Sequence, residues 1–178
     1  MILLRRNPLS HARLAAAAFA VLLVGGLSLQ AQAQLGTLPA NNTFVGHWVW
    51  NVAASSQPGQ QQGQPSEPRS LTLEIVAADP GRVEWSMTEM DPKGGAHIQS
   101  FTGTGDGRPG PVKGNEMNAT AAFTIKGPVM TVAFTTPDGG SDHLSCSLSP
   151  NGRQMTCRGT ESDNRGNRED YVDVYDRR

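Results

Sequence analysis

Residues 119–140, ATAAFTIKGPVMTVAFTTPDGG, carry the clearest structural signal in the sequence. Within 119–125, and again within 130–134, apolar residues occupy every second position, which is typical of strands that bury one face. Lys126-Gly127-Pro128 separates the two runs, and Pro137-Asp138-Gly139-Gly140 follows the second. Glycine and proline at these places favour turns, so the segment predicts a β-hairpin and an all-β fold.

The same alternation recurs along the chain at intervals of roughly ten residues. Short links join most neighbours, which predicts a single antiparallel up-and-down meander. Closure into a barrel of about eight or nine strands would remove the exposed edges, with a sandwich as the alternative. Residues 104–115 are expected to form a long glycine-rich loop. The expected strands are 44–52, 71–75, 83–87, 96–102, 119–125, 130–134, 144–148, 155–157 and 171–175.

The second face of each expected strand is polar, because Thr, Ser, Glu and Arg fill the positions between the apolar residues. An outer-membrane barrel needs an apolar outer band instead. The sequence therefore argues against a barrel that spans a membrane.

Two segments lie outside the strand pattern. Residues 1–33 combine a basic start, an apolar run at 14–29 and the ending Ala31-Gln32-Ala33, which predict a cleaved signal peptide. The protein is therefore expected to be exported, either to the periplasm or to the medium. Residues 54–68 are rich in Gln, Pro, Gly and Ser and are expected to form a mobile loop within a single domain covering 34–178.

Charge excludes one class of partner. The formal net charge is −1, and it becomes about −4 without residues 1–33, which leaves 12 basic against 16 acidic residues. With no basic patch, nucleic acid is not an expected partner. The oligomeric state is left open.

Cys146 and Cys157 flank one expected hairpin. A register that sets Cys146 opposite Cys157 also sets Leu148 opposite Met155, which makes one face uniformly apolar. Pro150-Asn151-Gly152 argues for a register shifted by one residue, because it suits a three-residue loop with glycine in the left-handed conformation. The buried face is the stronger constraint. Facing cysteines in an exported protein predict a structural disulfide, with a redox pair as the weaker alternative.

No catalytic or metal-binding motif stands out. His47, His97 and His143 lie on three expected strands, each opposite the apolar positions, and are expected to face solvent. Asp142 and His143, beside two serines, are residue types of a catalytic triad, but adjacent strand residues point to opposite faces. Residues 161–170 lack the order of a calcium loop. We therefore expect a non-catalytic protein without metal or cofactor.

Gly46-His47-Trp48 is similar to the G-x-W signature at the start of lipocalins. Most of the chain after residue 33 resembles a group of small exported bacterial proteins described as lipocalin-like, mostly without assigned activity. The resemblance implies a lipocalin-like barrel in which a basic residue of the last strand, Arg177, stacks on Trp48. The further matching positions are Asn51, Ser55, Gly114-Asn115, Ser149, Asn151-Gly152-Arg153, Met155-Thr156, Gly159-Thr160, Gly166 and Val174-Tyr175-Asp176.

Small residues stand at several expected inward positions, namely Gly46, Ser100, Ala119 and Ala121. An eight-stranded barrel is just wide enough to be filled by side chains or to hold one small ligand. We therefore expect a small apolar ligand, with an envelope structural or interaction protein as the alternative and a hydrolase or isomerase as a third. Tryptophans are more often core residues than ligand platforms. The candidate ligand-binding residues are Trp48, Trp50, Trp85, Phe123 and Phe134.

Overall fold

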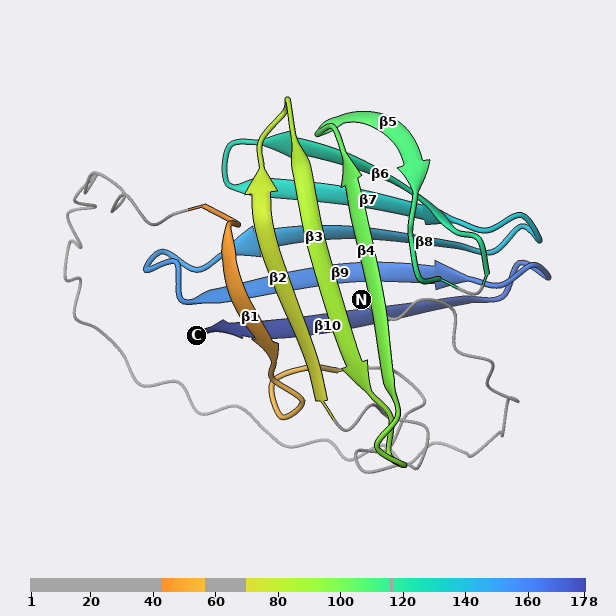
Figure 1. The fold of residues 1–178 in the computed structure, drawn as a ribbon, viewed down its shortest axis with the longest axis horizontal. Coiled ribbons are helices and arrows are strands. Elements are labelled where there is room, and N and C mark those ends of the chain that lie inside the picture. Colours follow the sequence, from red (N-terminus) through yellow and green to blue (C-terminus); the bar gives the residue numbers. More distant parts are fainter. Residues whose placement is uncertain (1–42, 57–69, 116) are drawn as a thin grey trace, which may run out of the picture. The chain divides into compact units, whose positions relative to one another are not determined.

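Ten antiparallel strands make up the part of the chain that the computed structural model describes, residues 43–56, 70–115 and 117–178 (Figure 1). The expected all-β meander is confirmed. No helix within these residues is long and apolar enough to cross a membrane. The strands are β1 (Gly46–Trp50), β2 (Ser70–Ala78), β3 (Val83–Met90), β4 (Ala96–Gly103), β5 (Asp106–Pro111), β6 (Thr120–Lys126), β7 (Val129–Thr135), β8 (Ser141–Leu148), β9 (Gln154–Ser162) and β10 (Arg168–Arg177).

The strands form one nearly closed barrel. Their order in the sheet is β4-β3-β2-β1-β10-β9-β8-β7-β6-β5, because β1 pairs with both β2 and β10. β4 and β5 are the two ends of this order. Ser100 of β4 and Lys113, just after β5, exchange two backbone hydrogen bonds of 3.0 and 2.8 Å across the join. We call this join between β4 and β5 the seam.

The barrel has one strand more than the upper expected number, because β5 lies inside the stretch 104–115 that was expected to be a loop. That expectation was wrong because the sequence of β5, DGRPGP, offers no alternating apolar pattern. Its backbone nevertheless pairs with β6, where Pro109 faces Ala122 and Pro111 faces Thr120. Proline has no backbone donor, so a strand at the end of the sheet order can hold two of them.

The core lies inside the barrel and is built from the inward positions of every strand except β5. Alternation holds well in β2, β6, β7 and β8, where buried residues alternate with more exposed ones. The two faces of each strand thus separate the apolar interior from a polar exterior, as period-two patterning requires. The largest side chains buried almost completely are Trp48, Tyr175, Phe101, Phe134, Met87 and Met155.

The hairpin β8–β9 has the register favoured by its buried face. Cys146 faces Cys157 and forms the expected disulfide, and Leu148 faces Met155. The competing expectation of a three-residue loop was wrong, because Ser149 and Gln154 close a loop of one more residue through a 2.8 Å backbone hydrogen bond. The preference of Gly152 for the left-handed conformation is still satisfied, at φ 66°.

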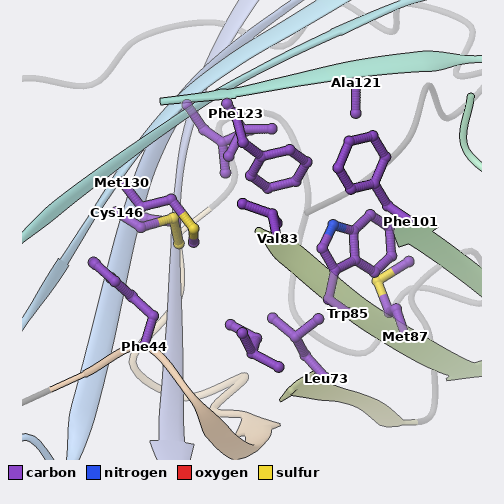
Figure 2. Close-up of a cluster of buried hydrophobic side chains, with 14 of the residues drawn as sticks. Phe44, Leu73, Val83, Trp85, Met87, Phe101, Ala121, Phe123, Met130 and Cys146 are labelled. Atoms are coloured by element: carbon purple, nitrogen blue, oxygen red, sulfur yellow. A yellow bond between two sulfur atoms is a disulfide. The ribbon is translucent and has the colours of Figure 1, made fainter. Parts of the chain in front are cut away.

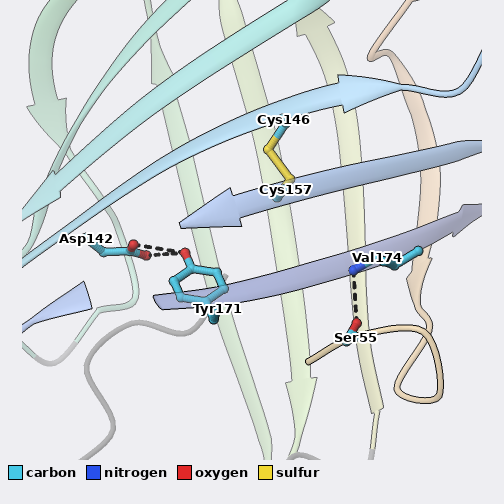
Figure 3. Close-up of a disulfide and its surroundings, with 6 residues drawn as sticks. All are labelled: Ser55, Asp142, Cys146, Cys157, Tyr171 and Val174. Atoms are coloured by element: carbon cyan, nitrogen blue, oxygen red, sulfur yellow. Dashed lines mark hydrogen bonds between the residues drawn. A yellow bond between two sulfur atoms is a disulfide. The ribbon is translucent and has the colours of Figure 1, made fainter. Parts of the chain in front are cut away.

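Two earlier expectations lie largely outside the described residues. The signal peptide at 1–33 is one of them, and the greater part of the loop at 54–68 is the other. The start of that loop is described and is held against β10. Ser56 pairs with Val172, and the Ser55 hydroxyl accepts a 2.9 Å hydrogen bond from the backbone N–H of Val174 (Figure 3).

Candidate binding site in the barrel interior

Four aromatic side chains from different strands meet inside the barrel. Trp85 of β3 stacks on Phe101 of β4, with ring centroids 6.4 Å apart and planes 17° apart. Phe123 of β6 lies 4.8 Å from Phe101, and Phe134 of β7 lies 6.2 Å from Phe123 and 6.5 Å from Trp85. Figure 2 shows the rings of Phe101 and Phe123 beside the indole. We call these four residues the aromatic cluster, and three of them were candidate ligand-binding residues.

The indole of Trp85 carries an unsatisfied hydrogen-bond donor. The residue is 4% exposed, and within the described residues its Nε1 has no hydrogen-bond partner. Figure 2 shows this nitrogen on the side of the ring that faces Val83, away from Met87, and both of these neighbours are buried and apolar. Buried polar groups are nearly always paired, so an unpaired one marks a place where an acceptor fits.

Small residues contribute to the same interior. Ala119 and Ala121 are 1% and 0% exposed, and Ala121 faces Phe134 across β6 and β7. The expectation that Ser100 points inward was wrong, because its neighbour Phe101 takes the inward position and Ser100 faces the outward Ser86 at the seam. The wall near the aromatic cluster is therefore lined on one side by methyl groups.

Phe101 covers the seam from within. A Cβ added at Gly103 would lie 2.5 Å from Cζ of Phe101, and one added at Gly110 of β5 would lie 3.2 Å from its Cε2. The ring therefore lies against the backbone of both seam strands, where only glycine leaves room. Phe101 was not predicted as an interior residue, because Ser100 was assigned to the inward phase of this strand.

Trp48 has a different role from the aromatic cluster. Its indole donates to the carbonyl of Phe44 at 2.9 Å, and the guanidinium of Arg177 lies 4.3 Å above the ring. The stacking implied by the resemblance is confirmed. Gly46 leaves space for it, since a Cβ there would be 2.6 Å from Nη1 of Arg177. The same guanidinium donates to the backbone carbonyls of Thr43, Val45 and Gly152 at 2.6, 2.7 and 2.7 Å.

Trp50 also has a polar partner of its own. Its Nε1 donates to Oδ1 of Asp173 at 3.0 Å, and Asp173 is 0% exposed. The structure thus places Trp85, Phe123 and Phe134 together, and it gives Trp48 and Trp50 partners elsewhere in the same hydrophobic core.

A second buried carboxylate, Asp142 of β8, is bound by Tyr171 of β10. The phenol lies 2.9 and 2.8 Å from the two carboxylate oxygens and donates to them (Figure 3). Burial raises the pKa of Asp142 to about 6, an effect that the hydrogen bond from Tyr171 opposes and the charge of Asp173 reinforces. Burial and Asp142 both raise the pKa of Tyr171. This pair was not predicted, although Asp142 is in phase with the inward Leu144.

The three histidines of the expected strands lie on the outer face, as expected. His47, His97 and His143 are all exposed, and Nε2 of His97 lies 3.7 Å from a carboxylate oxygen of Asp91. In the described part of the chain, no three His, Cys, Asp or Glu side chains come together in a way that could hold a metal ion.

The fold and its interior define a ten-stranded antiparallel meander barrel with an aromatic core. No family model matches the chain, and no curated protein matches it. One similar solved structure is a redesigned β-barrel, with 15% identity over 78% of this chain and 95% of the other, and a TM-score of 0.47. Another is the zebrafish ileal bile acid-binding protein in complex with cholic acid, with 16% identity over 76% and 98%, and a TM-score of 0.45.

Proposed function

We propose that the barrel binds one small, neutral, largely apolar molecule beside Trp85. The observation that carries the proposal is the buried Nε1 of Trp85 without an acceptor. Leaving a buried donor unpaired costs about 1–3 kcal/mol. A ligand that brings a carbonyl, ether or hydroxyl oxygen to this nitrogen would recover that energy, while its apolar body packs on the aromatic cluster.

The charges inside the barrel favour a neutral ligand. Asp142 and Asp173 are 1% and 0% exposed, and both carboxyl groups belong to inward strand positions. A carboxylate or phosphate on the ligand would be repelled by them in a medium of low dielectric constant. A fatty acid is therefore a poorer fit than an alcohol, ketone or ester of similar size.

The seam offers a route of entry. Its strands are joined at the bridge between Ser100 and Lys113, and the ring of Phe101 covers it from inside. A rotation of this ring into the barrel would open a path to Trp85, on which it now stacks. Entry by this route needs no rearrangement of the strand pairs on the far side of the barrel.

Export and the lack of catalysis are parts of the same proposal. The disulfide between Cys146 and Cys157 supports an oxidising compartment, in line with the signal peptide expected at 1–33 and with the resemblance to exported lipocalin-like proteins. The aromatic cluster can bind an apolar molecule by packing alone, so the proposed function requires no catalytic residues.

A specific observation favours a second candidate, an envelope structural or interaction protein with a filled core. The rings of Phe101 and Phe123 already lie 4.8 Å apart, within the range of directly packed aromatic pairs. In this case the interior holds only side chains, and the protein acts through its loops and outer face.

Native mass spectrometry of the protein purified from its own host separates the two candidates. A carrier retains an added mass that disappears on denaturation, and its tryptophan emission changes as the molecule leaves. Trp85→Phe keeps the ring and removes the donor, so it is expected to lose the ligand, whereas Trp50→Phe serves as the matched control. A bare mass, both as purified and after incubation with neutral lipid extract, contradicts the carrier proposal and leaves the filled barrel.

A further inference from the structure

A groove of about 490 Å³ lies on the outer face of β6, β7, β8 and β9, with Gly107 of β5 at its rim. This volume is within the range of sites for small molecules. Two lining residues, Val132 and Leu144, belong to the core, and the other lining residues of β6 to β9 occupy outward positions. The groove therefore lies on the outer side of the barrel wall, opposite the aromatic cluster.

Two cross-strand rows form the floor of the groove. In the first row, Thr124 faces Thr131, Thr131 faces Ser145, and Ser145 faces Arg158. Three hydroxyl groups and a guanidinium thus follow one another at the spacing of neighbouring strands, about 5 Å. We call this the hydroxyl row.

The second row is apolar for most of its length. Ala122 faces Ala133, and Ala133 faces His143. The methyl groups of the two alanines therefore lie beside the hydroxyl row, and the imidazole of His143 lies at the same end of the groove as Arg158.

The residues that line the groove carry positive but no negative charge. Arg158, His143 and Ser145 make no side-chain hydrogen bond or ion pair with the other described residues. The acids in the adjoining positions are engaged elsewhere. Asp106, which faces Thr124, binds Arg108 at 3.1 Å, and Asp170, which faces Thr160, accepts a 2.5 Å hydrogen bond from that threonine.

We propose that this groove is a second binding site, for a small molecule with a carboxylate or phosphate group and a short apolar body. The oxyanion binds the guanidinium of Arg158 and accepts a hydrogen bond from the hydroxyl of Ser145. The neighbouring Thr131 hydroxyl donates to the backbone carbonyl of Thr124 at 3.5 Å and must turn away from it to reach the same oxyanion. A guanidinium with neighbouring hydroxyl donors matches the planar oxygens of such groups. The apolar body lies along Ala122 and Ala133. The interior site takes a neutral ligand, so the two sites differ in the charge they select.

Nuclear magnetic resonance on the ¹⁵N-labelled full chain, produced by its own host, tests this proposal. The probes are butyrate, butyl phosphate and 1-butanol, which share an apolar body and differ in the head group. One or both anions are expected to shift the amide signals of Thr131 and Ser145 in a saturable way in the millimolar range, while butanol leaves them in place. The anion with the lower Kd identifies the preferred head group.

Matched variants locate the binding. Arg158→Ala is expected to raise the Kd for the anion about tenfold or more, whereas Arg165→Ala, in the loop between β9 and β10, leaves it unchanged. Arg158→Lys keeps the charge without the guanidinium fork and is expected to give an intermediate Kd. An absence of saturable shifts, or equal affinity in Arg158→Ala, would overturn the proposal. Loss of the interior ligand would not affect this result, because the readouts lie on opposite sides of the wall.

Discussion

The phenol ring of Tyr171 occupies the space above the backbone of Gly159. The two residues face each other across β10 and β9, and a Cβ at Gly159 would lie 2.3 Å from Cζ of the tyrosine. The ring crosses β9 at this point to reach Asp142 on β8. Gly159 is not among the residues with positive φ, so its backbone conformation does not require glycine. Glycine is needed at this position because a side chain would occupy the space of the tyrosine ring.

Gly159→Ala is therefore expected to lower the free energy of unfolding by ~2 kcal/mol, because the added methyl group displaces the ring and its hydrogen bonds. Urea denaturation measures the loss. In the double variant with Tyr171→Ala the clash is absent, so the two changes are expected to be far from additive. If the losses in unfolding free energy of the two single variants simply add in the double variant, the ring of Tyr171 does not lie over Gly159.

Asp142 makes the stability of the barrel depend on pH. Its pKa is raised from 3.8 to about 6, so between these values the folded state binds more protons than the unfolded state. The free energy of unfolding therefore decreases as pH rises from about 4 to about 6, by at most ~3 kcal/mol from this group. Urea denaturation across this range measures the slope. Asp142→Asn is expected to reduce the slope of the unfolding free energy against pH. If the slope is unchanged in this variant, other groups cause the pH dependence.

The guanidinium of Arg177 donates to three backbone carbonyl groups and stacks on the face of Trp48. Arg177→Ala is expected to lower the free energy of unfolding by ~2–3 kcal/mol, since these are hydrogen bonds from a charged donor. Thermal denaturation is the measurement, and exposed Arg178→Ala is the matched control. Equal effects of the two changes would show that the guanidinium contacts contribute little.

The Cys146–Cys157 disulfide closes a short segment, with a sequence separation of 11 residues. Its removal by Cys146→Ala with Cys157→Ala is expected to lower the free energy of unfolding by ~2–3 kcal/mol. Wild-type protein in reductant should show a similar loss, and the double variant should be insensitive to reductant. If reductant destabilises both proteins equally, the effect does not come from this bond.

Phe101→Leu shortens the side chain that covers the seam while keeping an apolar residue there. The variant is expected to bind and release a neutral apolar dye such as Nile red faster than wild type, because the path to Trp85 is less obstructed. Stopped-flow fluorescence measures both rates. Phe134→Leu, in the same aromatic cluster but away from the seam, is the control. Equal acceleration in both variants would contradict entry at the seam.

Alternation of apolar residues was sufficient to predict the meander, since it reports directly which face of a strand is buried. It failed at β5, where glycines and prolines pair through the backbone alone. It succeeded in the β8–β9 hairpin, where the apolar face overrode the preference of the turn residues. Cys146 and Met155 are buried in this register, and Gly152 still adopts the left-handed conformation in a loop of one more residue.

The interior was only partly predictable. Trp85, Phe123 and Phe134 were found because aromatic residues in phase with a strand lie inside. Asp142 and Asp173 were missed, although each is in phase with buried neighbours on its strand. The free donor of Trp85 and the position of Phe101 could not be predicted, because they depend on how separate strands pack.

The contact of Tyr171 with Asp142 has a mechanical consequence. The side chain links β10 to β8 over the top of β9, and the disulfide ties β9 to β8. A pull on the C-terminus must break a link across two strands before it can peel β10 away, and β9 cannot leave β8 at all while the sulfurs remain bonded. We therefore expect the barrel to unzip from its seam under load, with the last three strands separating after all the others.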